Sequence, residues 1–212
     1  MKKINVGTLV SVVFYLVISM GRTEFLLNTK IIIIFLMGII ASYYQADYHP
    51  FKPKNNEIDK GTVLHIIWTV YLTQALALIE AFYFNYPKSL EFNAPAIIFL
   101  IMALIGLWYR SWAYISLGKF FTMHLETQKN HKIIDTGPYK FIRHPSYTGA
   151  FLTYVFIPLA FESYYSAVVS VVLFSWAFYR RITHEEAMLE VQLGEPYKEF
   201  CSKRSRLFPG IY

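Results

Sequence analysis

Cysteine and charge are both scarce in this sequence, and each shortage excludes a class of protein. Cys201 is the single cysteine, so the chain has no intramolecular disulfide. No group of Cys and His has the spacing of a metal site, and we expect no bound metal. Charged residues make up only 16% of the 212 residues and hydrophobic residues 55%, a balance too apolar for an ordinary soluble domain.

Long apolar runs account for this hydrophobicity. A helix needs about 20 apolar residues to cross a bilayer, and six runs approach that length. They cover residues 4–20, 29–46, 62–84, 94–117, 146–161 and 163–180. Only Pro158 and Glu162 divide the last two runs. The alternative to six spans is therefore five, with the last two runs joined in one bent segment. Residues 146–180 are too long to cross once, which favours two spans.

We therefore predict an all-α integral membrane protein with about six transmembrane helices, the last two forming a helical hairpin. A helical pattern continues over residues 181–193 and predicts a cytosolic C-terminal helix that ends at Gly194. The first run starts with Lys2 and Lys3, but no small-residue cleavage pattern follows it. We expect it to remain as a span and not to be removed as a signal peptide.

Basic residues are unevenly distributed between the two ends of these runs. If the N-terminus is cytoplasmic, 16 of the 20 Lys and Arg residues lie in cytoplasmic segments. The others are Arg22, Lys30 and Lys88 on the opposite side and Arg110 within the fourth run. The positive-inside rule then predicts that both termini are cytoplasmic. This multi-pass topology explains the net charge of +6, so we expect no nucleic-acid partner.

The polar residues divide what we predict to be a single membrane domain, residues 1–212, into two parts. Residues 1–117 are predicted to form a four-helix scaffold, whose loop 47–61 is expected to be a solvent-facing connector. Within its spans, Glu80 is expected to snorkel to the interface, whereas Arg110 either snorkels or pairs with a carboxylate or a ligand. Residues 118–212 contain most of the polar residues and are predicted to form the catalytic part.

The stretch DTGPYKFIRHPSYTGAFL, residues 135–152, lies in this second part and is rich in glycine, proline and polar residues. Gly137 and Pro138 end any regular structure, and Pro145 stands where a helix favours proline, at its first position. The first turn of a helix presents unpaired N–H groups and partial positive charge, which suit a carboxylate or another anion. We expect Arg143 and His144 to add to that positive field.

A second polar block follows the last apolar run. Arg181 and Glu185 are spaced i,i+4 and so share one helix face. One possibility is that they form a surface ion pair that contributes little stability. The other is that they form part of a site for a zwitterionic ligand, since both lie where the last span emerges, level with His144.

Two segments together carry a resemblance to a known family. GPYKFIRHPSYTG, followed by RITHEEAML and LGEPYKEF, resembles the isoprenylcysteine carboxyl methyltransferase family and the related phospholipid N-methyltransferases. Those families carry a G-P-Y-x-x-x-R-H-P-x-Y-x-G segment, an Arg-x-x-x-Glu-Glu helix and a Gly-x-x-Tyr. The resemblance covers residues 106–212. It implies an integral-membrane enzyme that uses S-adenosylmethionine without a Rossmann domain.

By position, the resemblance implies a donor site made from both polar blocks and an acceptor site beside it. Arg181 matches the arginine that contacts the acceptor, and Glu185 matches the acidic residue that binds the donor. A family glutamine corresponds to Gln128 or Glu126, and Phe200 replaces a family tyrosine. The other residues implied for the donor site are His131, Lys132, Ile133, Ile134, Tyr139, His144, Pro145, Ser146 and Tyr147.

Transfer to a carboxylate needs no general base, and Arg181 favours such an acceptor over a cationic amine. An amine acceptor, as in phospholipid N-methylation, would need a base, for which Glu186 and His184 are the candidates. We expect an amphipathic or lipid-linked acceptor, because a soluble acceptor would not require six spans. Two alternatives are an NADPH-dependent sterol-reductase-like enzyme, suggested by the ending RLFPGIY, and a non-enzymatic transport or scaffold protein.

Overall fold

The structure is a computed structural model, and it describes residues 13, 25, 27–44, 59–122, 125 and 132–210 of the chain. The expected first span at residues 4–20 lies outside the described residues apart from Val13. Within the described part, every regular element is a helix, and one isolated β-bridge joins Ile142 to Ser205. The prediction of an all-α protein is confirmed for these residues.

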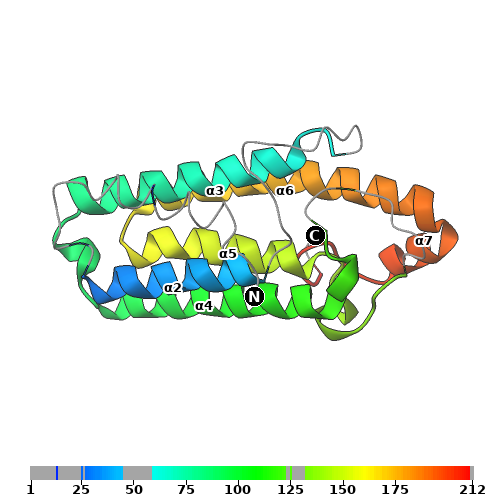
Figure 1. The fold of residues 1–212 in the computed structure, drawn as a ribbon, viewed down its shortest axis with the longest axis horizontal. Helices are drawn as coiled ribbons and strands as arrows, with labels where there is room; N and C mark the ends of the chain where they lie inside the picture. The colour runs from blue at the N-terminus through cyan, green and yellow to red at the C-terminus, as the bar shows by residue number, and fades with distance from the viewer. Residues whose placement is uncertain are drawn as a thin grey trace.

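Long helices lie side by side along the molecule (Figure 1). They are α2 (Thr29–Tyr43), α3 (Thr62–Ile79), α4 (Ala94–Leu117), α5 (Pro145–Ala160) and α6 (Tyr164–Leu193). α4 packs against α2 and α5, and α6 packs against α3 and α5. Of the described segments, Thr62–Phe84 and Ala94–Phe120 are long and apolar enough to cross a membrane, and α2 is a shorter apolar helix.

α6 differs from the expected division into a span and a separate cytosolic helix. It is one continuous helix of 30 residues, so residues 181–193 extend the helix that begins at Tyr164. Its sequence contains neither glycine nor proline, so nothing breaks it before Gly194, where φ is 63°. The end at Gly194 was predicted correctly. A short helix, α7 (Glu195–Ser202), follows directly and was not predicted.

Two glycines allow α4 and α5 to approach closely. A Cβ on Gly149 would lie 2.5 Å from the backbone N of Arg110, and one on Gly106 would lie 2.7 Å from the backbone N of Thr153. Real Cβ atoms do not tolerate such contacts, so both positions require glycine. This packing brings Arg110 on α4 next to the first turns of α5.

Buried charges hold the helices together at the end of the bundle far from α7. Nζ of Lys30, a fully buried residue, donates to the carbonyl oxygens of Ser89, Glu91 and Ala160 at 2.8, 2.7 and 2.9 Å. Three segments that are distant in sequence therefore share one ammonium group. The lysine supplies donors to carbonyls that water would otherwise satisfy.

Glu80 does not snorkel, contrary to the sequence expectation. Its carboxylate is buried and accepts hydrogen bonds from the backbone N–H groups of Tyr165 and Ser166 at 3.2 and 2.8 Å. The Ser166 hydroxyl donates to it as well, at 2.6 Å. Glu80 thus caps the N-terminus of α6, where a negative charge is stabilised by unpaired N–H groups.

Candidate active site

The segment that leads into α5 has the local geometry that its sequence predicts. Gly137 has a φ of 59°, and a Cβ there would lie 2.5 Å from the Ser116 hydroxyl oxygen, so only glycine fits. A 3₁₀ turn, η5 (Gly137–Lys140), follows and buries Tyr139. Pro145 then occupies the start of α5, as expected. Burial raises the pKa of the Tyr139 phenol, so this hydroxyl stays neutral at physiological pH.

Residues 204–207, here called the C-terminal strap, lie against this segment. The backbone N–H groups of Arg143 and His144 donate to the carbonyl oxygens of Ser205 and Arg206, both at 3.0 Å. The hydroxyl of Thr148 donates to the carbonyl oxygen of Leu207 at 2.8 Å. The strap therefore fixes the first turn of α5 from outside. No local sequence pattern indicated this pairing.

The Arg181 side chain is buried within a network of four partners. Its Nε lies 3.0 Å from the Tyr147 hydroxyl and 3.7 Å from the Glu185 carboxylate, and the same hydroxyl donates to Glu185 at 2.6 Å. Its Nη1 donates to Thr62 at 3.1 Å and is ion-paired with Asp59. Arg181 is only 3% exposed, so the alternative of a weak surface ion pair is wrong.

Asp59 is a residue that the sequence analysis missed. It falls in the loop expected to be a solvent-facing connector, yet it is 4% exposed. Besides pairing with Arg181, its carboxylate accepts hydrogen bonds from the backbone N–H groups of Val63 and Leu125 at 3.3 and 3.4 Å. Burial lowers the pKa of Arg181, but Tyr147, Glu185 and Asp59 raise it by more, so the guanidinium stays charged.

His144 and Glu186 form a second cluster beside the first. Nε2 of His144 and Nε of Arg143 lie 3.1 and 3.3 Å from one carboxylate oxygen of Glu186. Nε and Nη2 of Arg206 each lie 2.9 Å from the other oxygen. Burial alone would raise the pKa of Glu186, but hydrogen bonding to His144 and the neighbouring cations lower it overall. Glu186 is therefore a firmly ionised carboxylate.

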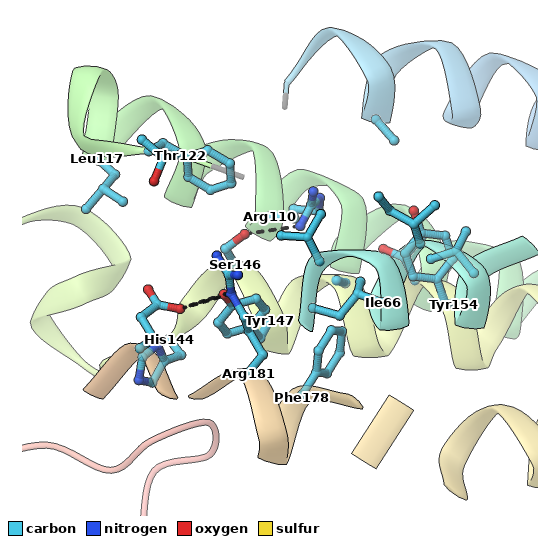
Figure 2. A pocket seen from close by; sticks show the side chains of 18 of the residues that line it. Ile66, Arg110, Leu117, Thr122, His144, Ser146, Tyr147, Tyr154, Phe178 and Arg181 are labelled. Carbon is cyan, nitrogen blue, oxygen red and sulfur yellow. Dashed lines mark hydrogen bonds and ion pairs between the residues drawn. The ribbon is translucent and has the colours of Figure 1, made fainter. Parts of the chain in front are cut away.

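One cavity of about 350 Å³ connects His144, Tyr147, Arg181 and Glu185 with the interior of the bundle. Figure 2 shows His144, Tyr147 and Arg181 gathered at one end, with Ile66, Tyr154 and Phe178 farther along. Its walls come from both the expected scaffold and the expected catalytic part. Apolar side chains line its far arm: Ile31, Met37, Ala77, Leu78, Ile157 and Phe161.

Most of the residues expected at the donor site line this single cavity. Pro145 is buried at the start of α5 and is not part of the lining, and Glu186 lies behind His144. Gln128 and His131 lie outside the described residues, as does Glu126. The expected residues that do line the cavity are Lys132, Ile133, Ile134, Tyr139, His144, Ser146, Tyr147, Arg181 and Glu185.

The sequence left two possibilities for Arg110, snorkelling or pairing with a carboxylate or a ligand. In the structure Arg110 also lines the cavity. Its Nη1 donates to the Ser146 hydroxyl at 3.2 Å (Figure 2). Its Nε is buried and has no hydrogen-bond partner among the described residues. A guanidinium with a buried, unpaired N–H beside a cavity is suited to an anionic ligand, because an unsatisfied buried donor costs about 1–3 kcal/mol.

Residues 97–191 match the model of the isoprenylcysteine carboxyl methyltransferase (ICMT) family. A probable protein-S-isoprenylcysteine O-methyltransferase of Oryza sativa subsp. indica is 33% identical over 138 residues, which are 63% of this chain and 66% of that protein. The chain thus spans just under two thirds of this relative's length. The protein-S-isoprenylcysteine O-methyltransferase of Schizosaccharomyces pombe is 33% identical over 105 residues, 47% of this chain and 43% of that protein.

A solved structure shares the fold. It is described as the eukaryotic intramembrane Ras methyltransferase ICMT, and it matches with a TM-score of 0.61 and 20% sequence identity. The match covers 95% of this chain and 85% of that one. The bundle in Figure 1 is therefore a known architecture.

Proposed function

We propose that this chain is a membrane methyltransferase of the isoprenylcysteine carboxyl methyltransferase family, because residues 97–191 match the model of that family. It transfers the methyl group of S-adenosylmethionine to the carboxylate of an isoprenylcysteine-like, lipid-linked acceptor at the cytosolic face. The observation that carries this proposal is the single cavity with a polar end and an apolar arm. The charged donor requires a polar environment and the hydrocarbon tail of the acceptor requires an apolar one, and methyl transfer requires the two to be adjacent.

The residues at the polar end fit the donor. Glu185 supplies a carboxylate that attracts its positive charges, and the buried Tyr139 and the half-buried Tyr147 supply aromatic faces and hydroxyl groups. The N-terminus of α5, a 16-residue helix, favours the carboxylate of the amino acid portion. When bound, S-adenosylmethionine supplies a methyl group on an already activated sulfonium. The protein's contribution is then positioning and the exclusion of water.

We assign the acceptor carboxylate to Arg110, with Arg181 as its neighbour. The guanidinium of Arg181 already contacts Asp59, Thr62 and Tyr147, and these contacts satisfy much of its hydrogen-bonding capacity. Arg110 has a buried Nε without a partner among the described residues and lines the same cavity. An incoming carboxylate would therefore gain more from Arg110, while Arg181 orients Glu185 and Tyr147.

The arrangement favours carboxyl methylation over the phospholipid N-methyltransferase alternative. An amine nucleophile must lose a proton before it attacks, and Glu186 and His184 were the candidate bases. His184 does not line the cavity. Glu186 is held by Arg143, His144 and Arg206, which lower its pKa and make it a poor proton acceptor. A carboxylate acceptor needs no base, and Arg110 and Arg181 at the cavity complement its charge.

We also propose that the chain crosses the membrane six times with both termini in the cytosol. Outward-facing apolar side chains on several helices support this topology. Ile32, Leu36 and Ile40 on α2, and Val168, Val172 and Trp176 on α6, are more than a third exposed, and none of them lines the cavity. Exposed apolar surfaces of this kind are expected on helices that face lipid. The polar end of the cavity then lies at the cytosolic rim, and the apolar arm extends into the bilayer core.

A binding and transfer experiment tests the function. Calorimetry on the purified protein in detergent should show binding of S-adenosylmethionine and none of NADPH. Incubation with methyl-labelled donor and N-acetyl-S-farnesylcysteine should give an organic-soluble product that releases its label in alkali, as a methyl ester does. Label that resists alkali after incubation with phosphatidylethanolamine vesicles would favour N-methylation. Binding of NADPH would favour the reductase, and binding of neither a non-enzymatic protein.

The role of Arg110 is tested in the same assay. Arg110→Leu should lower transfer by roughly 10²–10³-fold, the effect typical of removing one electrostatic contact to the reacting group. Affinity for S-adenosylmethionine should stay near that of the parent protein. A variant that transfers normally, or that loses donor and acceptor binding together, would contradict the assignment.

A further inference from the structure

The C-terminal strap makes contacts that the proposed methyl transfer does not itself use. Its backbone accepts hydrogen bonds from Arg143 and His144, and Arg204 Nε donates to the carbonyl oxygen of Lys140 at 3.1 Å. These contacts join residues about 60 positions apart, and they all fall on the segment that leads into α5. The strap is therefore attached specifically to the part of the chain that presents His144 and Tyr147 to the cavity.

Arg206 is the strap residue whose side chain contacts Glu186 beside this site. It contacts one oxygen of Glu186 through two nitrogen atoms, and the other oxygen faces His144. Neither Arg206 nor Glu186 lines the cavity, whereas His144 does. Arg206 contacts Glu186, and Glu186 contacts His144 in the cavity wall, so these contacts link Arg206 to a ligand in the cavity.

We propose that Arg206 is a positioning residue for the donor site. It fixes Glu186, which in turn orients the His144 ring, while the Arg206 carbonyl oxygen holds the His144 backbone. The same residue thus acts on the His144 ring through Glu186 and holds the His144 backbone directly. This inference rests on the proposed function, because it names S-adenosylmethionine as the ligand whose binding Arg206 supports. The acceptor, whose carboxylate is assigned to Arg110, is not reached by this relay.

The test compares Arg206→Ala and Arg206→Lys with a matched control, Lys203→Ala. Lys203 is also basic and directly precedes the strap, but its ammonium group pairs with the exposed Glu199, at 2.6 Å. Calorimetry should show that Arg206→Ala weakens binding of S-adenosylmethionine roughly tenfold, because charge-assisted hydrogen bonds are among the stronger ones. The KM of the acceptor and kcat at saturating donor should change less than about twofold. Arg206→Lys should recover most of the affinity, and Lys203→Ala should equal the parent protein.

Two results would overturn the inference. One is unchanged donor affinity in Arg206→Ala. The other is a change of equal size in all three quantities, with lower donor affinity, higher acceptor KM and lower kcat, which indicates general disruption. If the parent protein binds no S-adenosylmethionine, the proposed function fails, and amide hydrogen exchange over residues 141–148 becomes the test. Faster exchange in Arg206→Ala than in Lys203→Ala supports positioning by the strap, and equal exchange contradicts it.

Discussion

The guanidinium of Arg181 on α6 is ion-paired with the carboxylate of Asp59, which lies 122 residues earlier and just before α3. Both side chains are about 5% exposed or less. Asp59 also accepts a hydrogen bond from the backbone N–H of Leu125, which comes from the segment between α4 and α5. This carboxylate therefore connects α3, α6 and a wall of the candidate active site.

Replacing Asp59 with asparagine should destabilise the protein by about 3 kcal/mol. Breaking a buried ion pair typically costs about 3–5 kcal/mol, since the partner charge stays buried without compensation. The lower value applies because Glu185 remains 3.7 Å from Arg181. Thermal unfolding in detergent measures the loss. The control is Asp135→Asn, an exposed acidic residue whose replacement should change stability by less than about 0.5 kcal/mol. Equal unfolding temperatures for the two variants would contradict a buried pair.

Much of the helical framework could be predicted from sequence because its signals are local. The apolar runs at residues 62–84 and 94–117 became helices, and Gly194 ended α6. Gly137 and Pro145 have the backbone roles that their residue types indicate. These features depend on neighbours within a few residues, so a single sequence contains the information.

The rest of the site depends on partners that lie far apart in the chain. From sequence, Asp59 is predicted to be a solvated charge in a polar loop, and Glu80 is predicted to extend its carboxylate to the membrane interface. Only the packing of α3 against α6 shows that Asp59 faces Arg181 and that Glu80 caps a helix 85 residues away. The strap likewise pairs Ser205 with Ile142 without any periodic pattern. Single-sequence reasoning has no means of choosing such partners.

The contact between α4 and α5 leads to a prediction about Gly149. An alanine there would place its Cβ 2.5 Å from the backbone N of Arg110 and 2.6 Å from the Gly106 carbonyl oxygen. Both are backbone atoms, so the helices must separate, and we expect a loss of stability of about 1–3 kcal/mol. The displacement should also move Arg110 within the cavity and lower methyl transfer.

Gly38 on α2 provides a matched control for this substitution. Among the described residues, no atom outside its own stretch of helix lies within 4 Å of a Cβ built at Gly38, which is in a helix interior. Gly38→Ala should therefore stabilise the helix, by about 0.5–1 kcal/mol, because alanine loses less conformational freedom than glycine. The two variants should shift the unfolding temperature in opposite directions. A Gly149→Ala protein as stable as the parent would show that α4 and α5 are not in close contact.

The charge cluster around Glu186 predicts how stability depends on pH. Hydrogen bonding to His144 and the charges of Arg143 and Arg206 lower the pKa of Glu186 below its ordinary value of 4.5, against the opposing effect of burial. A carboxylate whose pKa is lower in the folded state stabilises that state above the unfolded pKa. This contribution is lost as the pH falls through the folded pKa. The groups that face Glu186 are basic, apart from the Tyr197 phenol on α7, whose pKa burial raises.

Thermal unfolding of the parent protein and of Glu186→Gln between pH 7 and pH 3 measures this contribution. The parent should be the more stable protein at pH 7, and the difference should shrink as the pH falls below about 4.5. Glu190→Gln is the control, because Glu190 forms only a surface pair with Lys198 at 3.7 Å, with both side chains about half exposed. Its difference from the parent should stay small at every pH. A gap between parent and Glu186→Gln that stays constant down to pH 3 would mean that the ionised carboxylate does not hold His144 and the strap together.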